Sequence, residues 1–152
     1  MSKLTHVYDI HRDGWKDWFQ LHVSKTKEIM QRHVKAMNKK YRWNIFDIDA
    51  KEFNLVLGCV QPVYHSEGCF AIMFLNEQAL GGGVVAHECL HVAMAHERHV
   101  LQFKMDYGPE CGEDEERLAY YLTEVVKSVN NVIYDNGHAE PGRAKKGRRS
   151  KL

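Results

Sequence analysis

The chain lacks the long apolar segments and the strong charge that would assign it to several protein classes at once. No apolar run approaches the roughly 20 residues needed to span a bilayer, and the segment MSKLTHVYDIHRDGW has no apolar core of a secretory signal. A formal net charge of +1 excludes a strong overall attraction to nucleic acid or to membranes. We therefore expect a cytoplasmic protein with no membrane partner.

Paired cysteines are also absent, because the four cysteines are far apart and none has CxxC spacing. This excludes a zinc ribbon and a thioredoxin-like redox motif. With 152 residues, 44% of them hydrophobic, the chain can bury one core. We predict a single domain over residues 1–135 and a disordered basic tail over residues 136–152, where large apolar side chains are nearly missing.

The spacing of apolar residues predicts helices separated by a short stretch of strands. One amphipathic helix is expected from Asp13, as its N-cap, to about Lys40. Strand-forming residues and a turn at residues 65–68 predict a hairpin of two strands, with Pro62 at an edge or a bulge. The predicted strands and the two later helices are Phe53 to Tyr64, Cys69 to Asn76, Val84 to Leu101 and Glu113 to Val132. The expected fold class is α+β.

The ten histidines include one pair with the spacing of a metal site, in the HExxH sequence His87-Glu88-Cys89-Leu90-His91. In a helix, residues four apart lie on one face, so both imidazoles can reach one zinc ion. Glu88 would then accept a proton from a metal-bound water, whose pKa zinc lowers to about 7. A histidine-rich chain can contain this motif by chance, but here it lies in an apolar predicted helix after a strand and a glycine turn.

A zinc site needs a third protein ligand, and the acidic start of the last predicted helix offers one. At 100° per residue, Glu115 lies roughly 45° from the centre of the apolar face and Glu116 roughly 145° away. Glu115 is therefore expected to face inward, with Glu116 as the alternative ligand. Asp114 flanks the same face and could hydrogen-bond to a ligating imidazole. The competing interpretation is that these acidic residues only complement the helix dipole.

Two histidines downstream of the motif, His96 and His99, are the other candidates for a third ligand. The longer metzincin pattern HExxHxxGxxH fails here, because Met94 and Glu97 occupy its glycine and last histidine positions. We expect His96 and His99 to face solvent.

The segments VVAHECLHVAMAH and EDEERLAYYLTEVV resemble minimal gluzincin-like domains of phages and mobile elements, over about Phe70 to Val129. In such domains a helix and a small sheet precede the HExxH helix, and a helix with a glutamate follows. The resemblance implies a zincin-like fold, one zinc ion per chain, and a hydrolase of the metallopeptidase class acting on a protein or peptide. It implies His87 and His91 as ligands with Glu115, Glu88 as base, and the host cytoplasm as the location if a phage encodes the chain.

The substrate site can also be predicted in outline. Tyr120 and Tyr121 could donate a hydroxyl hydrogen to a developing oxyanion, although helix tyrosines are more often packing residues. An extended substrate can add as a strand to a sheet edge, and the strand Cys69 to Asn76 is the expected edge.

Two other functions fit the same sequence. One is a catalytically silent zincin-fold module that binds a protein partner. The other is a DNA-associated protein whose basic tail contacts phosphates without sequence preference. The tail has six Lys and Arg residues but no aromatic residue to stack on bases, which favours a solvated terminus.

Overall fold

The computed structural model describes residues 4–14, 16–43, 56–63, 68–101 and 112–138. Within these ranges the chain forms three α-helices and one four-stranded mixed sheet. None of the described helices has both the length and the apolarity that a membrane crossing requires. The elements are β1 (Thr5–His11), β2 (Trp18–Ser24), α1 (Lys27–Tyr41), β3 (Gly58–Pro62), β4 (Cys69–Asn76), the 3-10 turn η2 (Glu77–Ala79), α2 (Gly82–Ala95), the π-helical turn η3 (His96–Val100) and α3 (Gly112–Asp135).

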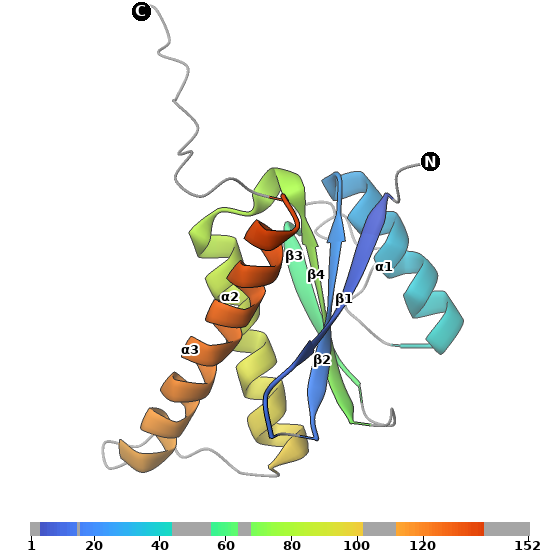
Figure 1. Cartoon of the computed structure of the whole chain (residues 1–152). Helices are drawn as coiled ribbons and strands as arrows, with labels where there is room; N and C mark the ends of the chain where they lie inside the picture. The colour runs from blue at the N-terminus through green and yellow to red at the C-terminus, as the bar shows by residue number, and fades with distance from the viewer. Residues whose placement is uncertain (1–3, 15, 44–55, 64–67, 102–111, 139–152) are drawn as a thin grey trace, which may run out of the picture.

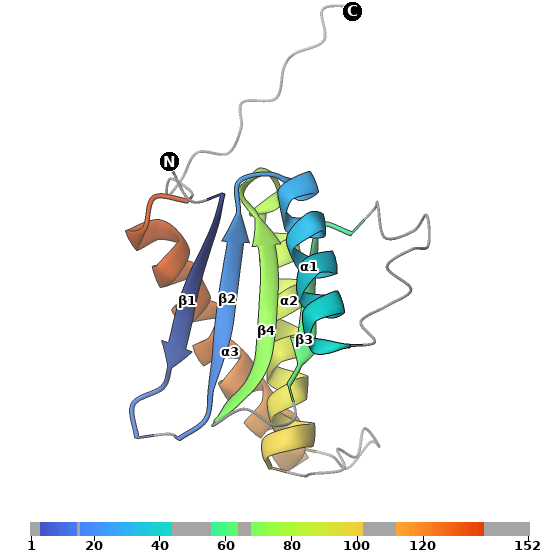
Figure 2. The ribbon, with the colours of Figure 1, turned by 90° about the vertical axis from the view of Figure 1, so that its right-hand side faces the viewer.

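The sheet has the strand order β1-β2-β4-β3, so β1 and β3 are its edge strands. β1 runs antiparallel to β2, β2 runs parallel to β4, and β3 runs antiparallel to β4. Helix α1 covers one face of the sheet, and α2 and α3 cover the other (Figure 1). On that second face, α3 lies behind β1 and β2, and α2 lies behind β4 and β3 (Figure 2). The α+β class expected from the sequence is confirmed.

The predicted helix from Asp13 to Lys40 is wrong in its first half. Trp18–Ser24 forms β2 instead, and α1 begins only after Thr26. The side-chain oxygen of Thr26 accepts a hydrogen bond from the backbone N–H of Ile29 at 3.3 Å, so Thr26 rather than Asp13 is the N-cap. In β2 successive side chains point to opposite faces of the sheet. Hydrogen-bonded pairing with β1 and β4 stabilises this strand conformation over the helix that the sequence predicted.

The other predicted elements are closer to the structure. The last two helices are present as α2 with η3 and as α3, and the predicted hairpin is present as the antiparallel pair β3 and β4. Pro62 ends the edge strand β3, as expected. Three predicted segments lie outside the described residues. They are the start of the strand predicted from Phe53, residues 65–67 of the predicted turn, and the basic tail after His138.

The prediction that Cys69–Asn76 is the sheet edge is wrong. This strand, β4, pairs with β2 on one side and with β3 on the other, and all eight of its residues are buried. Its sequence, CFAIMFLN, is a nearly continuous apolar run, which is typical of a strand that is covered on both faces. The edge strand beside α2 is therefore β3.

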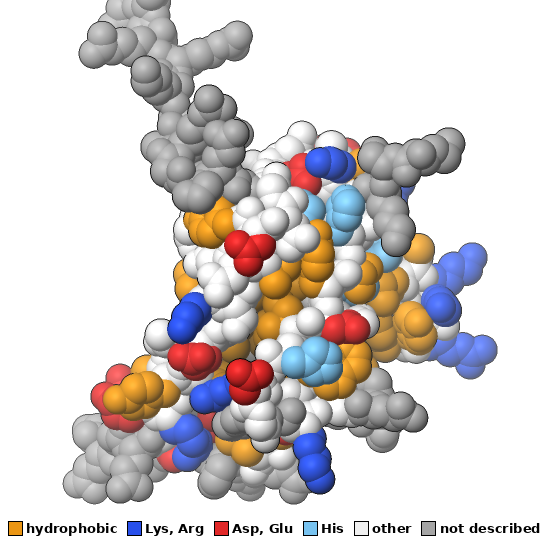
Figure 3. Space-filling model, in the orientation of Figure 1, with side chains coloured by type: hydrophobic (Ala, Val, Ile, Leu, Met, Phe, Trp, Pro, Cys, Tyr) orange, Lys and Arg blue, Asp and Glu red, His pale blue; other side chains and the backbone are white. Residues whose placement is uncertain are grey.

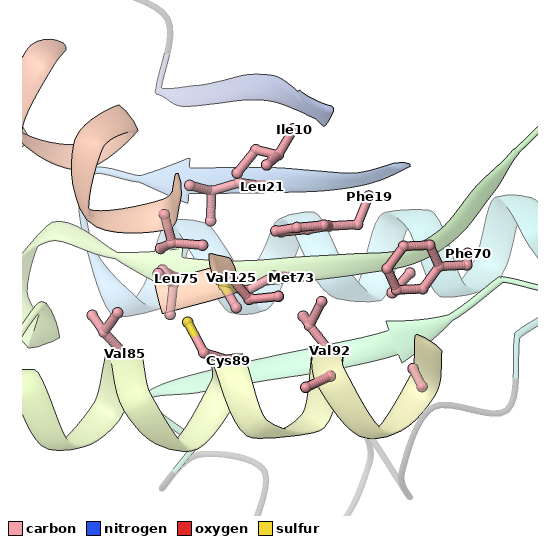
Figure 4. Packing of buried hydrophobic residues seen from close by; sticks show 14 of the residues in the cluster. Ile10, Phe19, Leu21, Phe70, Met73, Leu75, Val85, Cys89, Val92 and Val125 are labelled. Atoms are coloured by element: carbon pink, nitrogen blue, oxygen red, sulfur yellow. The ribbon is translucent and has the colours of Figure 1, made fainter. Parts of the chain in front are cut away.

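Successive residues of β4 point to opposite faces and so divide the core into two clusters. Ala71, Met73 and Leu75 pack towards α2 and α3, whereas Ile72 and Phe74 pack beneath α1. The larger cluster is shown in Figure 4, where the labelled residues are Ile10, Phe19, Leu21, Phe70, Met73, Leu75, Val85, Cys89, Val92 and Val125.

A buried histidine, His22 of β2, lies beneath α1 with 3% of its surface exposed. Its Nδ1 is 2.8 Å from Nε2 of His33, and its Nε2 is 3.2 Å from Oε1 of Gln20. The amide nitrogen of Gln20 donates to Asp9, so its oxygen faces His22 and accepts the hydrogen on Nε2. Burial, followed by the neighbouring His33, lowers the pKa of His22 to about 4.

This lowered pKa predicts a loss of stability in mild acid. The folded state favours the neutral form of His22, whereas the unfolded chain takes up a proton near the ordinary histidine pKa of about 6.5. The resulting contribution to the free energy of unfolding is fully present above about pH 6.5 and is lost as the pH falls through about 4. The expected loss between pH 7 and pH 4 is about 3 kcal/mol of unfolding free energy. Urea unfolding at a series of pH values measures it.

The His22→Phe variant supplies the comparison, because it keeps a ring at the edge of Phe74 but cannot take up a proton. Its unfolding free energy should vary less over this pH range than that of the wild-type protein. Equal pH profiles for the two proteins would contradict the prediction.

Candidate metal centre

Helix α2 carries the HExxH motif directly after β4 and η2. The helix begins after Gly81, whose extended backbone forms the N-cap. Cys89 is fully buried in the face that packs on the sheet. His87 and His91 each lie about 160° around the helix from Cys89, and both are exposed. Packing of α2 on the sheet therefore turns the two histidines outward together.

The two imidazole rings of His87 and His91 converge. Their Nε2 atoms are 3.1 Å apart, and their ring centroids are 4.8 Å apart. Two nitrogen ligands of a tetrahedral zinc ion, each about 2.0–2.1 Å from the metal, would be about 3.3 Å apart. Burial, followed by the nearby His87, lowers the pKa of His91, which favours the neutral ring that metal ligation requires. The pair thus has the geometry of two ligands.

The third motif residue, Glu88, is buried, with 5% of its surface exposed. Its Oε2 atom has no hydrogen-bond partner among the described residues. Burial raises the pKa of this carboxyl, and the charge of His87 opposes the shift. A buried carboxylate oxygen without a partner is costly for the fold. Glu88 is therefore a residue whose placement calls for a functional explanation.

Glu88 approaches the edge strand β3 at Gly58. A Cβ atom built on Gly58 would lie 2.9 Å from Cγ of Glu88 and 3.2 Å from the backbone oxygen of Phe74. Real Cβ atoms essentially never show a contact under 3.0 Å. The glycine therefore allows the glutamate side chain to lie directly against the strand.

A groove of about 530 Å³ separates α2 from β3 beside these residues. One wall comes from the start of α2 and the other from β3 and the two residues before it. The lining residues are Val56, Leu57, Gly58, Cys59, Val60, Gly83, Val84, His87, Glu88 and His91. The histidine pair, the buried carboxylate and a sheet edge thus share one groove.

Glu115 and Glu116 are not brought to the histidine pair. Both are exposed, so the prediction that Glu115 faces inward is wrong. The buried face of α3 begins at Tyr121 and continues through Val125, so Glu115 precedes the part of the helix that packs on the core. Within the described ranges no three His, Cys, Asp or Glu side chains form a group able to hold a metal ion. The identity of the third ligand stays a prediction.

Asp114 does not hydrogen-bond to an imidazole of the motif in the way the sequence suggested. Its Oδ1 accepts from Nη1 of Arg117 at 3.1 Å. Arg117 also donates to Oε2 of Glu97, from Nη2 at 2.7 Å and from Nε at 3.0 Å, and its Nε donates to Oε1 at 3.2 Å. Glu97 is fully buried. Because an unpaired buried carboxylate is costly, this network joins the start of α3 to η3 rather than serving the metal site.

His96 is buried, with 1% of its surface exposed, so the expectation that it faces solvent is wrong. It lies seven residues, two helical turns, after Cys89 and so shares the buried face of α2. Its ring stacks on Tyr121, with the ring centroids 4.1 Å apart. His99, by contrast, is half-buried.

The two tyrosines proposed as oxyanion donors lie elsewhere in the structure. Burial raises the pKa of Tyr121, which packs in the core of α3, and Tyr120 is exposed on that helix. Neither is among the described residues that line the groove. Tyr121 is therefore a packing residue and Tyr120 a surface residue, and neither is placed to donate a hydrogen bond in the groove.

Gly58 and Cys59 line the groove but were not among the residues predicted from the sequence. For Gly58 a sequence signal exists, because a glycine inside a strand often marks the close approach of another group. Cys59 has no such signal. Burial, followed by the charge of Glu88, raises the pKa of its thiol to about 12, so the thiol stays protonated at neutral pH.

Comparison with protein-family models, with curated proteins and with solved structures found no match for this chain. The groove itself offers two converging imidazole nitrogens, a buried carboxyl group and an adjacent strand edge. This set of groups can bind a divalent metal and can accept a proton next to it.

The histidine geometry predicts that zinc binding depends on His91. The wild-type protein should hold about one zinc ion per chain after dialysis, because two of the ligands are already converged. His91→Ala should reduce the zinc content at least tenfold, as measured by elemental analysis. His99→Ala, eight residues further along the chain in η3, is the control and should leave the zinc content unchanged. Equal zinc content in the two variants would contradict the assignment.

The third ligand is open to the same measurement. Because Glu115 and Glu116 are exposed and form no group with the histidine pair in the described part of the chain, we expect Glu115→Gln and Glu116→Gln to bind zinc like the wild-type protein in a competition assay with a chromogenic chelator. Zinc binding at least tenfold weaker in one variant would contradict this expectation and identify that residue as a ligand, because an amide is a poorer zinc ligand than a carboxylate.

Proposed function

We propose that this protein is a zinc-dependent metallopeptidase of the zincin type. One observation carries the proposal: two imidazole nitrogens 3.1 Å apart lie beside a buried carboxylate in a groove that a sheet edge borders. Metal ligands, a proton acceptor and a surface for an extended chain are the three components that zinc-dependent peptide hydrolysis needs.

His87 and His91 would hold the metal through their Nε2 atoms. Their separation fits two positions of a tetrahedral site, and their exposure on α2 leaves room for further ligands. A bound zinc ion supplies Lewis acidity, which polarises the substrate carbonyl and makes water a strong nucleophile at neutral pH. The described residues do not identify a third protein ligand, because neither Glu115 nor Glu116 is grouped with the histidine pair.

Glu88 would act as the general base. It lies one residue from His87 and one turn from His91, so its carboxylate can take a proton from the attacking water and later donate that proton to the leaving amine. Burial raises the pKa of the carboxyl, which brings proton acceptance and release closer to neutral pH. The absence of a hydrogen-bond partner for Oε2 among the described residues leaves that atom available for this role.

The edge strand β3 would bind the substrate. Its one strand partner is β4, so the other side of β3 is the free edge of the sheet in the described part of the chain. An extended peptide can add there through backbone hydrogen bonds, and its side chains would enter the groove beside α2. The lining is mainly apolar and carries His87, Glu88 and His91 as its ionisable members besides the buried thiol of Cys59.

Substitution of the base tests the mechanism. Glu88→Gln keeps the size of the side chain but cannot accept the proton, so cleavage of unstructured peptides should fall by roughly 100-fold to 10,000-fold. Zinc content should not change, since Glu88 is not a ligand in this proposal. Glu124→Gln, an exposed position on α3, is the matched control. Peptide cleavage is followed by mass spectrometry.

Full cleavage by Glu88→Gln would refute the role of the base. If instead the wild-type protein binds zinc but cleaves no peptide, and Glu88→Gln binds the same partner as the wild type, the protein is the catalytically silent binding module.

The close approach at β3 gives a second test. Gly58→Ala should reduce the rate of cleavage roughly tenfold, because the added methyl group must displace Glu88 by a few tenths of an ångström. Zinc content should stay at the wild-type level. Gly81→Ala is the control, since a Cβ at Gly81 meets no atom within 4 Å. If both alanine variants cleave at the wild-type rate, Gly58 does not position the base.

A further inference from the structure

Positive charge is concentrated on one helix. Residues 27–42 contain six Lys and Arg residues against one acidic residue, a net charge of +5, whereas the whole chain carries +1. The rest of the chain therefore has a net charge of −4. In Figure 3, Lys and Arg side chains project from the right-hand side of the molecule, where Figure 1 places α1.

The positive side chains of α1 lie opposite its buried face. Met30 and Val34 are fully buried against the sheet. At 100° per residue, Arg32, Lys35 and Lys39 lie about 140–200° from Met30, and all three are exposed. They form a stripe about 10 Å long, since each residue rises 1.5 Å. We call Arg32, Lys35 and Lys39 the basic stripe.

Most of this charge is not neutralised within the described part of the chain. No ion pair joins Arg32, Lys39 or Arg42 to a described acidic side chain. Glu28 is the acidic residue of the helix and lies one turn before Arg32, with which its charge interacts. Arg32 and Lys39 therefore present positive charge to solvent without an ion pair to a described acidic side chain.

The end of α1 is ordered by an aromatic pair. Tyr41 and Trp43 stack with their ring centroids 4.8 Å apart, and Nζ of Lys40 lies 4.8 Å from the centroid of the Tyr41 ring. Arg42 follows in the left-handed conformation, and its N–H bonds to the carbonyl of Asn38. Two further cations are thus held next to the stripe at the C-terminal end of the helix, where positive charge also complements the helix dipole.

We propose that the basic stripe of α1 binds the phosphodiester backbone of nucleic acid without sequence preference. Regularly spaced Lys and Arg side chains on an exposed helix bind phosphates by charge and by release of counterions. An anionic membrane surface fits less well, because a membrane-binding helix needs an exposed apolar face beside its cations, and the apolar residues Met30 and Val34 of α1 are buried on the sheet.

The proposed nucleic-acid surface is separate from the groove. Helix α1 covers one face of the sheet and α2 covers the other (Figure 2). The inference therefore does not rest on the metallopeptidase proposal, and each can fail without the other. If both hold, nucleic acid would bring the groove close to proteins that are bound to the same strand.

The test measures binding of a fluorescent 20-base-pair DNA duplex to the full chain by anisotropy over a range of KCl concentrations. The variant Arg32→Glu/Lys39→Glu should weaken binding at least tenfold at 100 mM KCl, and the slope of log Kd against log salt should fall by about 2. The control Lys16→Glu/Lys127→Glu changes the net charge equally, at two exposed positions outside α1. It should weaken binding less than threefold.

The tail is present in every variant, so binding through the tail alone would leave both variants similar to the wild type and would overturn the proposal. Equal weakening in the two variants would also overturn it, because net charge would then account for the effect. Thermal melting checks that both fold, and Arg32→Gln/Lys39→Gln replaces the first variant if it does not. Glu88→Gln should bind DNA like the wild type. Binding to vesicles containing phosphatidylserine but not to DNA would assign the stripe to a membrane.

Discussion

The burial of β4 on both faces is the constraint on which the rest of the structure depends. All eight of its residues are buried, and it pairs with β2 and β3 while helices cover both of its faces. A strand in this position must be covered, because each large apolar side chain contributes roughly 1.5–3 kcal/mol only when it leaves water. Covering β4 fixes α2 on one face and α1 on the other.

The candidate site follows from how α2 meets that constraint. The side of the helix with Cys89 packs on the sheet, so the side with His87 and His91 must face outward. Glu88 lies between these two sides and is turned towards β3, where Gly58 gives it room. A buried carboxylate destabilises the fold unless it is paired. The buried Glu88 carboxyl, whose Oε2 has no hydrogen-bond partner among the described residues, is therefore expected to cost stability.

Two other buried ionisable residues, Glu97 and His22, have hydrogen-bond partners for their polar atoms. Glu97 is equally inaccessible, but Arg117 donates two hydrogen bonds to its Oε2 and one to its Oε1. His22 is kept neutral by burial and hydrogen-bonds to His33 and Gln20. Both groups have partners that stabilise the fold, so they are structural. Glu88 differs from Glu97 and His22 in this respect, because its Oε2 has no hydrogen-bond partner among the described residues.

The local features of this protein can be predicted from its sequence. The spacing of His87 and His91 specified two imidazoles on one face of a helix, and the apolar periodicity specified α2 and α3. Both depend on contacts within three or four residues, which a helix geometry fixes in advance. The positive charge of residues 27–42 is likewise visible in the sequence.

The tertiary structure alone decided which segments became strands and what each side chain faced. Residues 18–24 form β2 because they pair with β1 and β4, not because of their own preference. The edge role of β3, the fit of Glu88 against Gly58 and the exposure of Glu115 all depend on elements far apart in the chain. Angles on one helix do not show where its neighbours end, and that is why the convergence of His87 and His91 could be predicted from the sequence whereas the exposure of Glu115 could not.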